Sequence, residues 1–82
     1  MEPIEEKVRA IITGEIPELT AAELTDDAEL VRDLGADSLD VELIRGEVEE
    51  QFNVDVTDEA MEKLKTVGDV VNLVRQLKIA VQ

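Results

Sequence analysis

The sequence contains no cysteine and no histidine, and these two absences exclude several kinds of site. Without cysteine there is no disulfide, no thiolate zinc site and no cysteine nucleophile. Without histidine the chain lacks the ordinary general base at neutral pH, a Ser–His pair and an imidazole metal ligand. A chain of 82 residues also leaves little room for a substrate cleft beside its core. We therefore expect a protein that does not catalyse a reaction by itself.

Tryptophan and tyrosine are also absent, and Phe52 is the one aromatic residue. The chain therefore has no set of aromatic rings on which nucleic-acid bases could stack. Its 21 acidic and 8 basic residues give a net charge of −13, which repels nucleic acid and anionic membranes and favours basic partners or cations. We expect a monomer with no nucleic-acid partner.

Long hydrophobic runs are missing as well, since no apolar stretch approaches the ~20 residues that span a bilayer. The first eight residues, MEPIEEKV, lack the basic start and apolar centre of a signal peptide. We expect a cytoplasmic protein without membrane insertion. Leu, Ile, Val and Phe nevertheless make up 27 of the 82 residues, enough for one folded domain over residues 1–82.

The first part of the chain combines one amphipathic helix with a long connection. Apolar residues at helical spacing predict a helix over residues 4–13, with Gly14 as its stop. Residues 15–37 show no long clean period, so we expect a loop with a short turn of helix at most. Six side chains are expected to hold this loop to the core: Ile16, Leu19, Leu24, Leu30, Val31 and Leu34.

A second helix is predicted to begin at Asp37-Ser38 and to end near Phe52. Asp37 is the expected cap, with Asp40 at the N3 position, where a carboxylate also favours the helix dipole. The core face of this helix is formed by four residues: Val41, Ile44, Val48 and Phe52.

Two more helices complete the predicted fold. Thr57 is expected to cap a short acidic helix that ends near Leu64, and Thr66 to cap a last helix that ends between residues 77 and 80. The fold class is therefore all-α: a small four-helix bundle of three main helices and one short helix, with a long first loop.

Ser38 is the only serine in the chain, and it lies where the long loop is predicted to enter the second helix. The commoner explanation for such a residue is a helix cap. A helix N-terminus also offers free N–H groups and a positive dipole end, which favour a phosphate attached to a serine there. No basic residue lies close to Ser38 in the sequence to activate it. Ser38 is thus a better acceptor for another enzyme's chemistry than a catalyst.

The segment DLGADSLD, from Asp33 to Asp40, resembles the motif of discrete type II acyl carrier proteins, and the resemblance covers nearly the whole chain. It includes EEQF at residues 49–52, the segment 53–60 and TVGD at residues 66–69. The resemblance implies that Ser38 accepts a 4′-phosphopantetheine arm from a phosphopantetheinyl transferase that uses coenzyme A. The thiol of the arm would then carry acyl groups as thioesters in fatty acid or related lipid or polyketide biosynthesis. The chain would be a protein substrate for partner enzymes and would have no catalytic residues of its own.

The second helix departs from the family pattern at several positions. In an ungapped alignment, Glu42 and Gly46 stand where the family usually has apolar docking residues, and Leu43 stands where an acidic residue is usual. Leu39 and Leu43 lie one turn apart on a face away from the core stripe. A gapped alignment that shifts residues 41–44 by one place restores the usual residues but needs a compensating insertion. These departures predict a dedicated set of partners rather than those of the housekeeping carrier of fatty acid synthesis.

The family resemblance implies acyl-transfer enzymes and chain-elongation or modifying enzymes as partners. Between Asp33 and Glu62 there are 11 acidic residues and one basic residue, Arg45, which adds a positive charge to a usually acidic face. We expect basic docking patches on the partners, because electrostatic steering gives fast association without a large interface. The expected contacts are seven residues: Asp37, Leu39, Asp40, Glu42, Leu43, Glu49 and Glu50. The core stripe of the second helix could also part to shelter an acyl chain, together with Val56, Leu64, Val67 and Val71.

Two other classes stay open from the sequence. Peptidyl or aryl carriers more often have Gly-Gly before the serine motif, whereas this chain has Gly35-Ala36. An acidic interaction protein or a divalent-cation-binding helical protein without a prosthetic group would also fit the charge. The best candidate loop for binding a cation is formed by residues 33–42. It lacks the alternating oxygen ligands and the central glycine of an EF-hand, so we expect no metal site.

Overall fold

The first helix packs its apolar stripe into the core, as the sequence predicts. In the structure, a computed structural model that describes residues 3–81, helix α1 spans Ile4–Glu15. Its buried residues are Val8, Ile11 and Ile12. The prediction that Gly14 stops this helix is wrong. The N–H of buried Ile16 donates to the carbonyl of Ile12 at 2.9 Å and completes a further turn, and Pro17 follows.

Residues 16–37 form the predicted long connection, with one short 3₁₀ turn, η1, at Ala21–Glu23. Five of the six side chains expected to hold it do contact the core: Ile16, Leu19, Leu24, Leu30 and Leu34. The prediction for Val31 is wrong, because this side chain is 64% exposed. Leu30 and Leu34 already face the core from the same turn of the chain, and their neighbour Val31 faces solvent.

Backbone pairing with the start of the last helix fixes this connection. The N–H of Leu30 donates to the carbonyl of Lys65 at 2.8 Å, and the N–H of Val67 donates to the carbonyl of Ala28 at 3.0 Å. A single antiparallel β-bridge lies between these two bonds. The loop therefore obtains its backbone partners from a segment far along the chain.

Arg9 ties the same loop to α1. Its Nε donates to the carbonyl of Leu24 at 2.8 Å, and its guanidinium pairs with the carboxylate of Asp26 at 2.8 Å. The carbonyl of Asp26 in turn accepts the N–H of Gly68 at 2.9 Å. A Cβ at Gly68 would lie only 3.0 Å from that carbonyl oxygen, so the close approach of loop and last helix favours glycine here.

The remaining helices begin where their caps predict. Helix α2 spans Ser38–Phe52, α3 spans Asp58–Glu62 and α4 spans Val67–Val81. The hydroxyl of Thr57 accepts the N–H of Ala60 at 3.2 Å, which confirms the predicted cap of α3. The helix ends lie close to those predicted: α3 stops two residues before Leu64, in a tighter turn, and α4 ends one residue past the predicted range.

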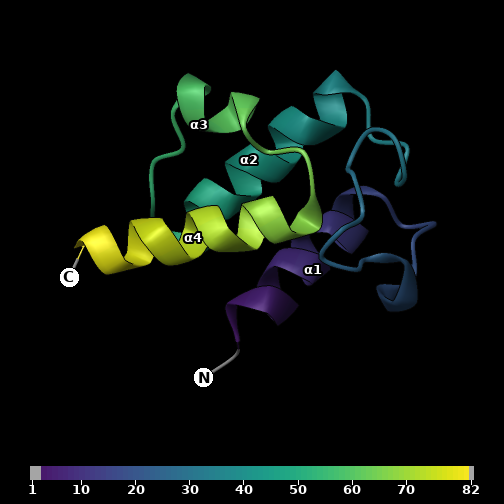
Figure 1. Ribbon diagram of the computed structural model, residues 1–82, viewed down its shortest axis with the longest axis horizontal. Helices are drawn as coiled ribbons and strands as arrows, with labels where there is room; N and C mark the ends of the chain where they lie inside the picture. Colours follow the sequence, from purple (N-terminus) through teal and green to yellow (C-terminus); the bar gives the residue numbers. More distant parts are fainter. Residues whose placement is uncertain (1–2, 82) are drawn as a thin grey trace.

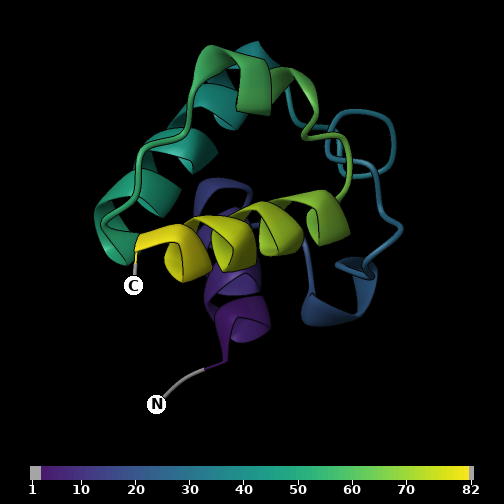
Figure 2. The same ribbon diagram turned by 60° about the vertical axis from the view of Figure 1, so that its left-hand side comes forward.

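Three long helices surround one apolar core, with α3 at its edge. Helix α1 contacts α2 and α4, which also contact each other, and α3 lies on the far side of α2 from α1 (Figures 1 and 2). The molecule measures 35 × 28 × 20 Å. The predicted fold class, a four-helix bundle of three main helices and one short one with a long first loop, is confirmed. Within residues 3–81, no helix is both long and apolar enough to cross a bilayer.

Candidate functional site

The turn before α2 is folded on itself and carries two side chains into the core. The N–H groups of Asp33 and Leu34 donate to the carbonyl of Glu29 at 2.9 and 3.0 Å. The carboxylate of Asp33 accepts the N–H of Glu29 at 2.9 Å. Gly35 has a φ of 74°, a left-handed conformation that glycine adopts without strain. This bend lets Leu34 and Ala36 both be buried while the chain turns into α2.

Asp37 and Asp40 cap α2 reciprocally. The carboxylate of Asp37 accepts the N–H of Asp40 at 2.9 Å, and the carboxylate of Asp40 accepts the N–H of Asp37 at 3.2 Å. This confirms the predicted cap and its N3 partner. Ser38 follows as the first residue of the helix and is exposed. Because Asp37 supplies the cap, the helix start does not depend on the Ser38 hydroxyl.

The position of Ser38 suits attachment of a phosphate-linked group. It begins a helix of 15 residues, whose free N–H groups and dipole favour a negative charge at that end. Its exposure leaves room for a long substituent and for the enzyme that adds it. The chain has no histidine or cysteine to activate the hydroxyl, and the side chains that flank it in the cap are carboxylates. The site therefore offers an exposed hydroxyl that can accept a group.

The seven expected contact residues divide into two groups in the structure. Five are exposed: Asp37, Leu39, Glu42, Leu43 and Glu50. Asp40 is half-buried in the cap, and half-buried Glu49 accepts the N–H of Val56 at 2.9 Å. Leu39 and Leu43, exposed by 66% and 45%, are with Val31 the exposed large hydrophobic side chains among those described.

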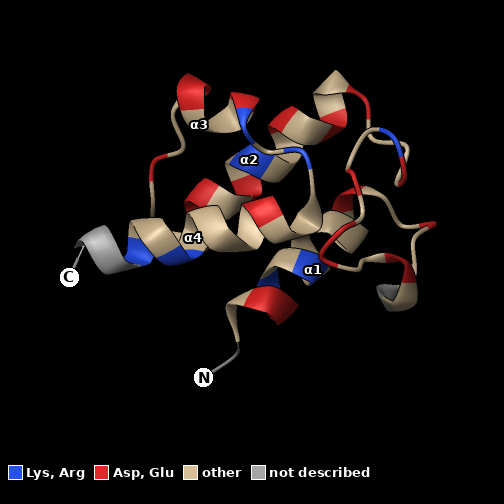
Figure 3. Ribbon diagram, in the orientation of Figure 1, with Lys and Arg blue, Asp and Glu red and all other residues tan. Residues whose placement is uncertain are grey.

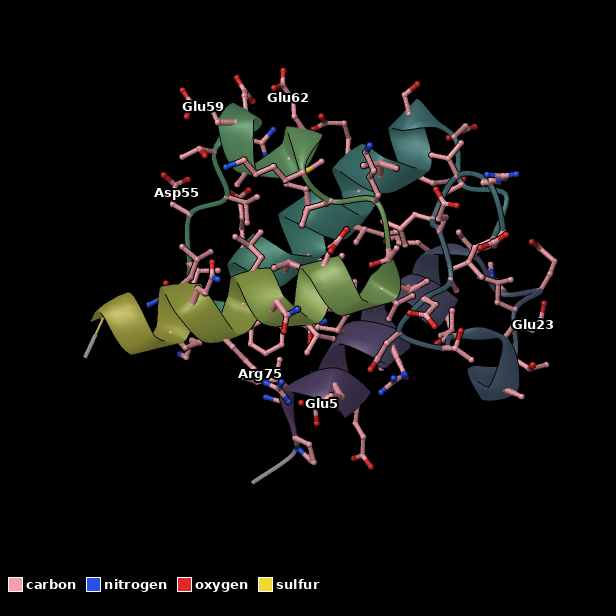
Figure 4. All side chains as sticks on the ribbon, viewed as in Figure 1. Glu5, Glu23, Asp55, Glu59, Glu62 and Arg75 are labelled. Carbon is pink, nitrogen blue, oxygen red and sulfur yellow. The ribbon has the colours of Figure 1, made fainter. Side chains whose placement is uncertain are left out.

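Acidic residues cover a large part of the surface around Ser38 and α2. Figure 3 shows them along α2, α3 and the loop before α2, whereas α1 carries both acidic and basic residues and the C-terminal half of α4 carries basic ones. In Figure 4 the carboxylates of Asp55, Glu59 and Glu62 point to solvent around α3, while Arg75 of α4 meets Glu5 of α1 in an ion pair. Among the described side chains, no group of three or more acidic residues is placed to hold a metal ion. The negative charge is therefore spread over the surface.

Arg45 lies among acidic residues of α2 and α3, and its side chain is mostly covered. Its side chain is only 19% exposed, and its Nε donates to the carbonyl of Val56 at 2.9 Å. Its Nη1 donates to the carboxylate of Asp58 at 3.0 Å and lies 3.7 Å from that of Glu42. The hydrogen bond to Asp58 raises the pKa of Arg45; partial burial opposes this rise, and the charges of Asp58, Glu42 and Glu49 add to it. In the sequence, Arg45 is the one basic residue in a long acidic stretch. This predicts an ion pair but does not identify the acidic partner.

Residues 6–74 match the protein family described as "Phosphopantetheine attachment site". The match includes the whole of α2 and α3 and the loop that leads to Ser38.

Curated relatives and a solved structure agree with this match. The chain is 44% identical over 75 residues to the "Acyl carrier protein" of Helicobacter pylori (strain J99 / ATCC 700824), which covers 92% of this chain and 95% of the relative. The protein of the same name from Helicobacter acinonychis (strain Sheeba) gives the same identity and coverage. A solved structure from Mycobacterium tuberculosis, described as an acyl carrier protein, superposes with a TM-score of 0.82 at 33% identity, over 89% of this chain and 96% of that one.

Proposed function

Since the chain belongs to the acyl carrier protein family, we propose that Ser38 is the residue to which its 4′-phosphopantetheine is attached. Proteins of this family are carriers rather than catalysts, and this chain carries acyl groups as thioesters on a covalently attached arm. When attached, the arm supplies the thiol that the cysteine-free chain lacks. The alternative of an acidic or cation-binding protein without a prosthetic group is not favoured.

One observation carries the assignment of Ser38. The only serine of the chain is exposed at the first position of α2, while the neighbouring Asp37 makes the cap that a serine at a helix start would otherwise provide. A hydroxyl that is free of this structural task can be modified without loss of the helix.

The attachment step needs a second protein. The O–H bond of Ser38 breaks and its oxygen forms a P–O bond to the phosphopantetheine phosphorus of coenzyme A. The pyrophosphate P–O bond of coenzyme A breaks, and its nucleotide part leaves with the bonding electron pair. The proton passes to a base of the phosphopantetheinyl transferase, because this chain has no histidine and the neighbouring carboxylates of Asp37 and Asp40 are already engaged by backbone N–H groups of the cap. The chain thus acts as a protein substrate in this step and has no catalytic residue.

The face of α2 beside Ser38 forms the proposed docking surface. Leu39 and Leu43 are exposed one turn apart and offer an apolar centre, with Asp37, Glu42 and Glu50 exposed as acidic contacts. Such a surface suits partners that present basic residues around an apolar pocket, and steering by charge lets a carrier visit several enzymes in turn.

Asp40 and Glu49 belong to this surface with a reduced role. Each already accepts a backbone N–H, from Asp37 and Val56 respectively, so a partner's basic side chain would share a carboxylate that is partly occupied. We propose that they contribute charge to the surface while the exposed residues make the closer contacts.

The displaced apolar pair on α2 favours a dedicated set of partners. Besides the transferase, these would be acyl-transfer, chain-elongation or modifying enzymes of fatty acid or related lipid or polyketide synthesis, and we propose that the protein works in the cytoplasm.

The test is to incubate the purified chain with coenzyme A and a broad-specificity phosphopantetheinyl transferase and to measure its intact mass. We expect a gain of one phosphopantetheine group on the wild type and none on Ser38→Ala. Because Ser38 is exposed and not the cap, the variant should lose less than about 1 kcal/mol of stability, measured by thermal melting. Loading of the variant at one of the five threonines would overturn the assignment.

A further inference from the structure

A small apolar cavity lies between α2, α3 and α4. It is lined by nine apolar side chains, among them Ile44, Val56, Leu64 and Leu73, and by one charged residue, Arg45. The free volume inside is only about 10 Å³, about that of one water-sized sphere. An acyl chain cannot enter this cavity unless its walls move apart.

The wall between α2 and α3 is held by two side chains one helical turn apart. Arg45 donates from Nε and Nη2 to the carbonyl of Val56, and Glu49 accepts the N–H of the same residue at 2.9 Å. Both backbone groups of Val56 are therefore fixed to α2, and its side chain, 1% exposed, fills the cavity wall. We refer to Arg45 and Glu49 with their contacts to Val56 as the clamp.

The clamp also holds α3. Arg45 pairs with Asp58, the first residue of α3, at 3.0 Å. This helix has only five residues and none of them is fully buried, so apolar packing alone secures it weakly. An arginine side chain with its stem against apolar residues and its charge toward the surface can close a cavity without an unpaired charge inside.

We propose that Arg45 is a specificity residue of this carrier: the clamp keeps the cavity closed, so that an acyl chain is sheltered only when Arg45 releases Val56 and Asp58. The proposal depends on the proposed attachment of the arm at Ser38. It follows that the intact clamp leaves the cargo largely outside the core and open to partner enzymes. Without the clamp, burial of each added methylene group would favour a longer chain inside the cavity.

The matched substitutions are Arg45→Met and Arg32→Met. Methionine keeps the unbranched stem of Arg45 but removes its hydrogen bonds to Val56 and Asp58, and only the bond from the N–H of Val56 to Glu49 is left. Arg32 is 81% exposed, so the second variant has the same change in charge with the clamp intact. Asp58→Asn, which removes only the charged contact to α3, is the variant to use where Arg45→Met does not fold.

Each protein is loaded from coenzyme A analogues that carry butanoyl, octanoyl or dodecanoyl groups in amide linkage, and loading is read by intact mass. The melting temperature of each loaded form is then compared with that of its own unloaded form. We expect the octanoyl and dodecanoyl forms of Arg45→Met to gain at least ~4 °C, and those of the wild type and Arg32→Met to gain less than half as much.

A second measurement needs no loading. In unmodified protein, the amide hydrogen of Val56 should exchange at least ~10-fold faster in Arg45→Met than in Arg32→Met, because only the bond to Glu49 then holds that segment and it opens more often. Equal exchange rates would overturn the clamp, as would equal gains in melting temperature for the wild type and Arg45→Met, or no gain in any protein. A wild type that does not gain mass would instead overturn the assignment of Ser38, and the exchange rates would still decide whether the clamp exists.

Discussion

Thr66 and Asp69 cap α4 by accepting each other's backbone N–H. The hydroxyl of Thr66 accepts the N–H of Asp69 at 3.1 Å, and the carboxylate of Asp69 accepts the N–H groups of Thr66 and Lys65 at 3.1 Å. Partial burial by itself raises the pKa of Asp69. The hydrogen bonds from Lys65 and Thr66 and the charge of Lys65 outweigh this effect, so the pKa is lowered overall.

The lowered pKa of Asp69 predicts acid sensitivity of the cap. A carboxylate whose pKa is lower in the folded state contributes stability above its unfolded pKa of about 3.9, and this contribution is lost as the pH falls through the folded value. We expect Asp69→Asn to melt below the wild type at neutral pH, with a difference that shrinks below about pH 4. Asp55→Asn, which removes an exposed charge near α3, is the control in melts across the same pH range. A constant difference for Asp69→Asn would contradict the prediction.

Replacing Gly46 by alanine is expected to stabilise the protein. Gly46 lies exposed in the middle of α2, and a Cβ there would meet no heavy atom within 4 Å. Gly46→Ala should raise the stability by about 1 kcal/mol and the melting temperature by about 4–8 °C, since alanine has the higher helix propensity. Gly35→Ala is the matched control and should destabilise by about 1–2 kcal/mol, because its φ of 74° is left-handed. Urea titration of both variants measures these changes, and effects of the same sign would show the explanation to be incorrect.

The exposed position of Leu43 allows docking to be tested separately from folding. Leu43→Glu adds a charge to a side chain that is already 45% exposed, so helicity and loading of Ser38 should stay nearly unchanged. Loss of an apolar contact at the centre of an interface costs more than about 1 kcal/mol, so KM for an acyl transferase that accepts the wild type should rise at least ~5-fold.

Val31→Glu is the control for this variant, because Val31 is also an exposed apolar side chain but lies outside α2. An unchanged KM for Leu43→Glu would exclude Leu43 from the docking surface. A large fall in its melting temperature would instead place the side chain in the core.

The net charge of −13 predicts stabilisation by salt. Like charges repel most in the folded state, and at about 0.15 M ionic strength screening acts over about 8 Å. The melting temperature at neutral pH should therefore rise with added salt, and millimolar calcium should raise it further at fixed ionic strength, through weak binding to neighbouring carboxylates. Thermal melts with and without calcium measure both effects. Saturation at micromolar calcium would contradict diffuse binding and indicate a specific site.

The starts of the helices could be predicted from the sequence because caps are local. Asp37, Thr57 and Thr66 each bond to an N–H three residues ahead, and the sequence alone contains that relationship. The buried stripes of α1 and α4 were predictable for the same reason, since helical spacing places their apolar residues on one face.

Features that depend on distant residues could not be predicted in this way. Gly14 does not end α1 because buried Ile16 stabilises the next turn, and this burial is decided by the rest of the core. Arg45 turns toward Val56 and Asp58, which lie beyond the end of its own helix. A basic residue in an acidic stretch has many possible partners, and only the folded chain determines which one it contacts.

Ser38 is synthesised before Lys65 and Val67, which lie 27 and 29 residues later in the chain. Until then the N–H of Leu30 and the carbonyl of Ala28 have only water as partners, and the loop that leads to the serine has no fixed shape. Domains of this size fold as cooperative units. A transferase that recognises the folded start of α2 will therefore modify only chains in which Lys65 and Val67 already pair with this loop, so attachment of the prosthetic group reports that the loop has folded.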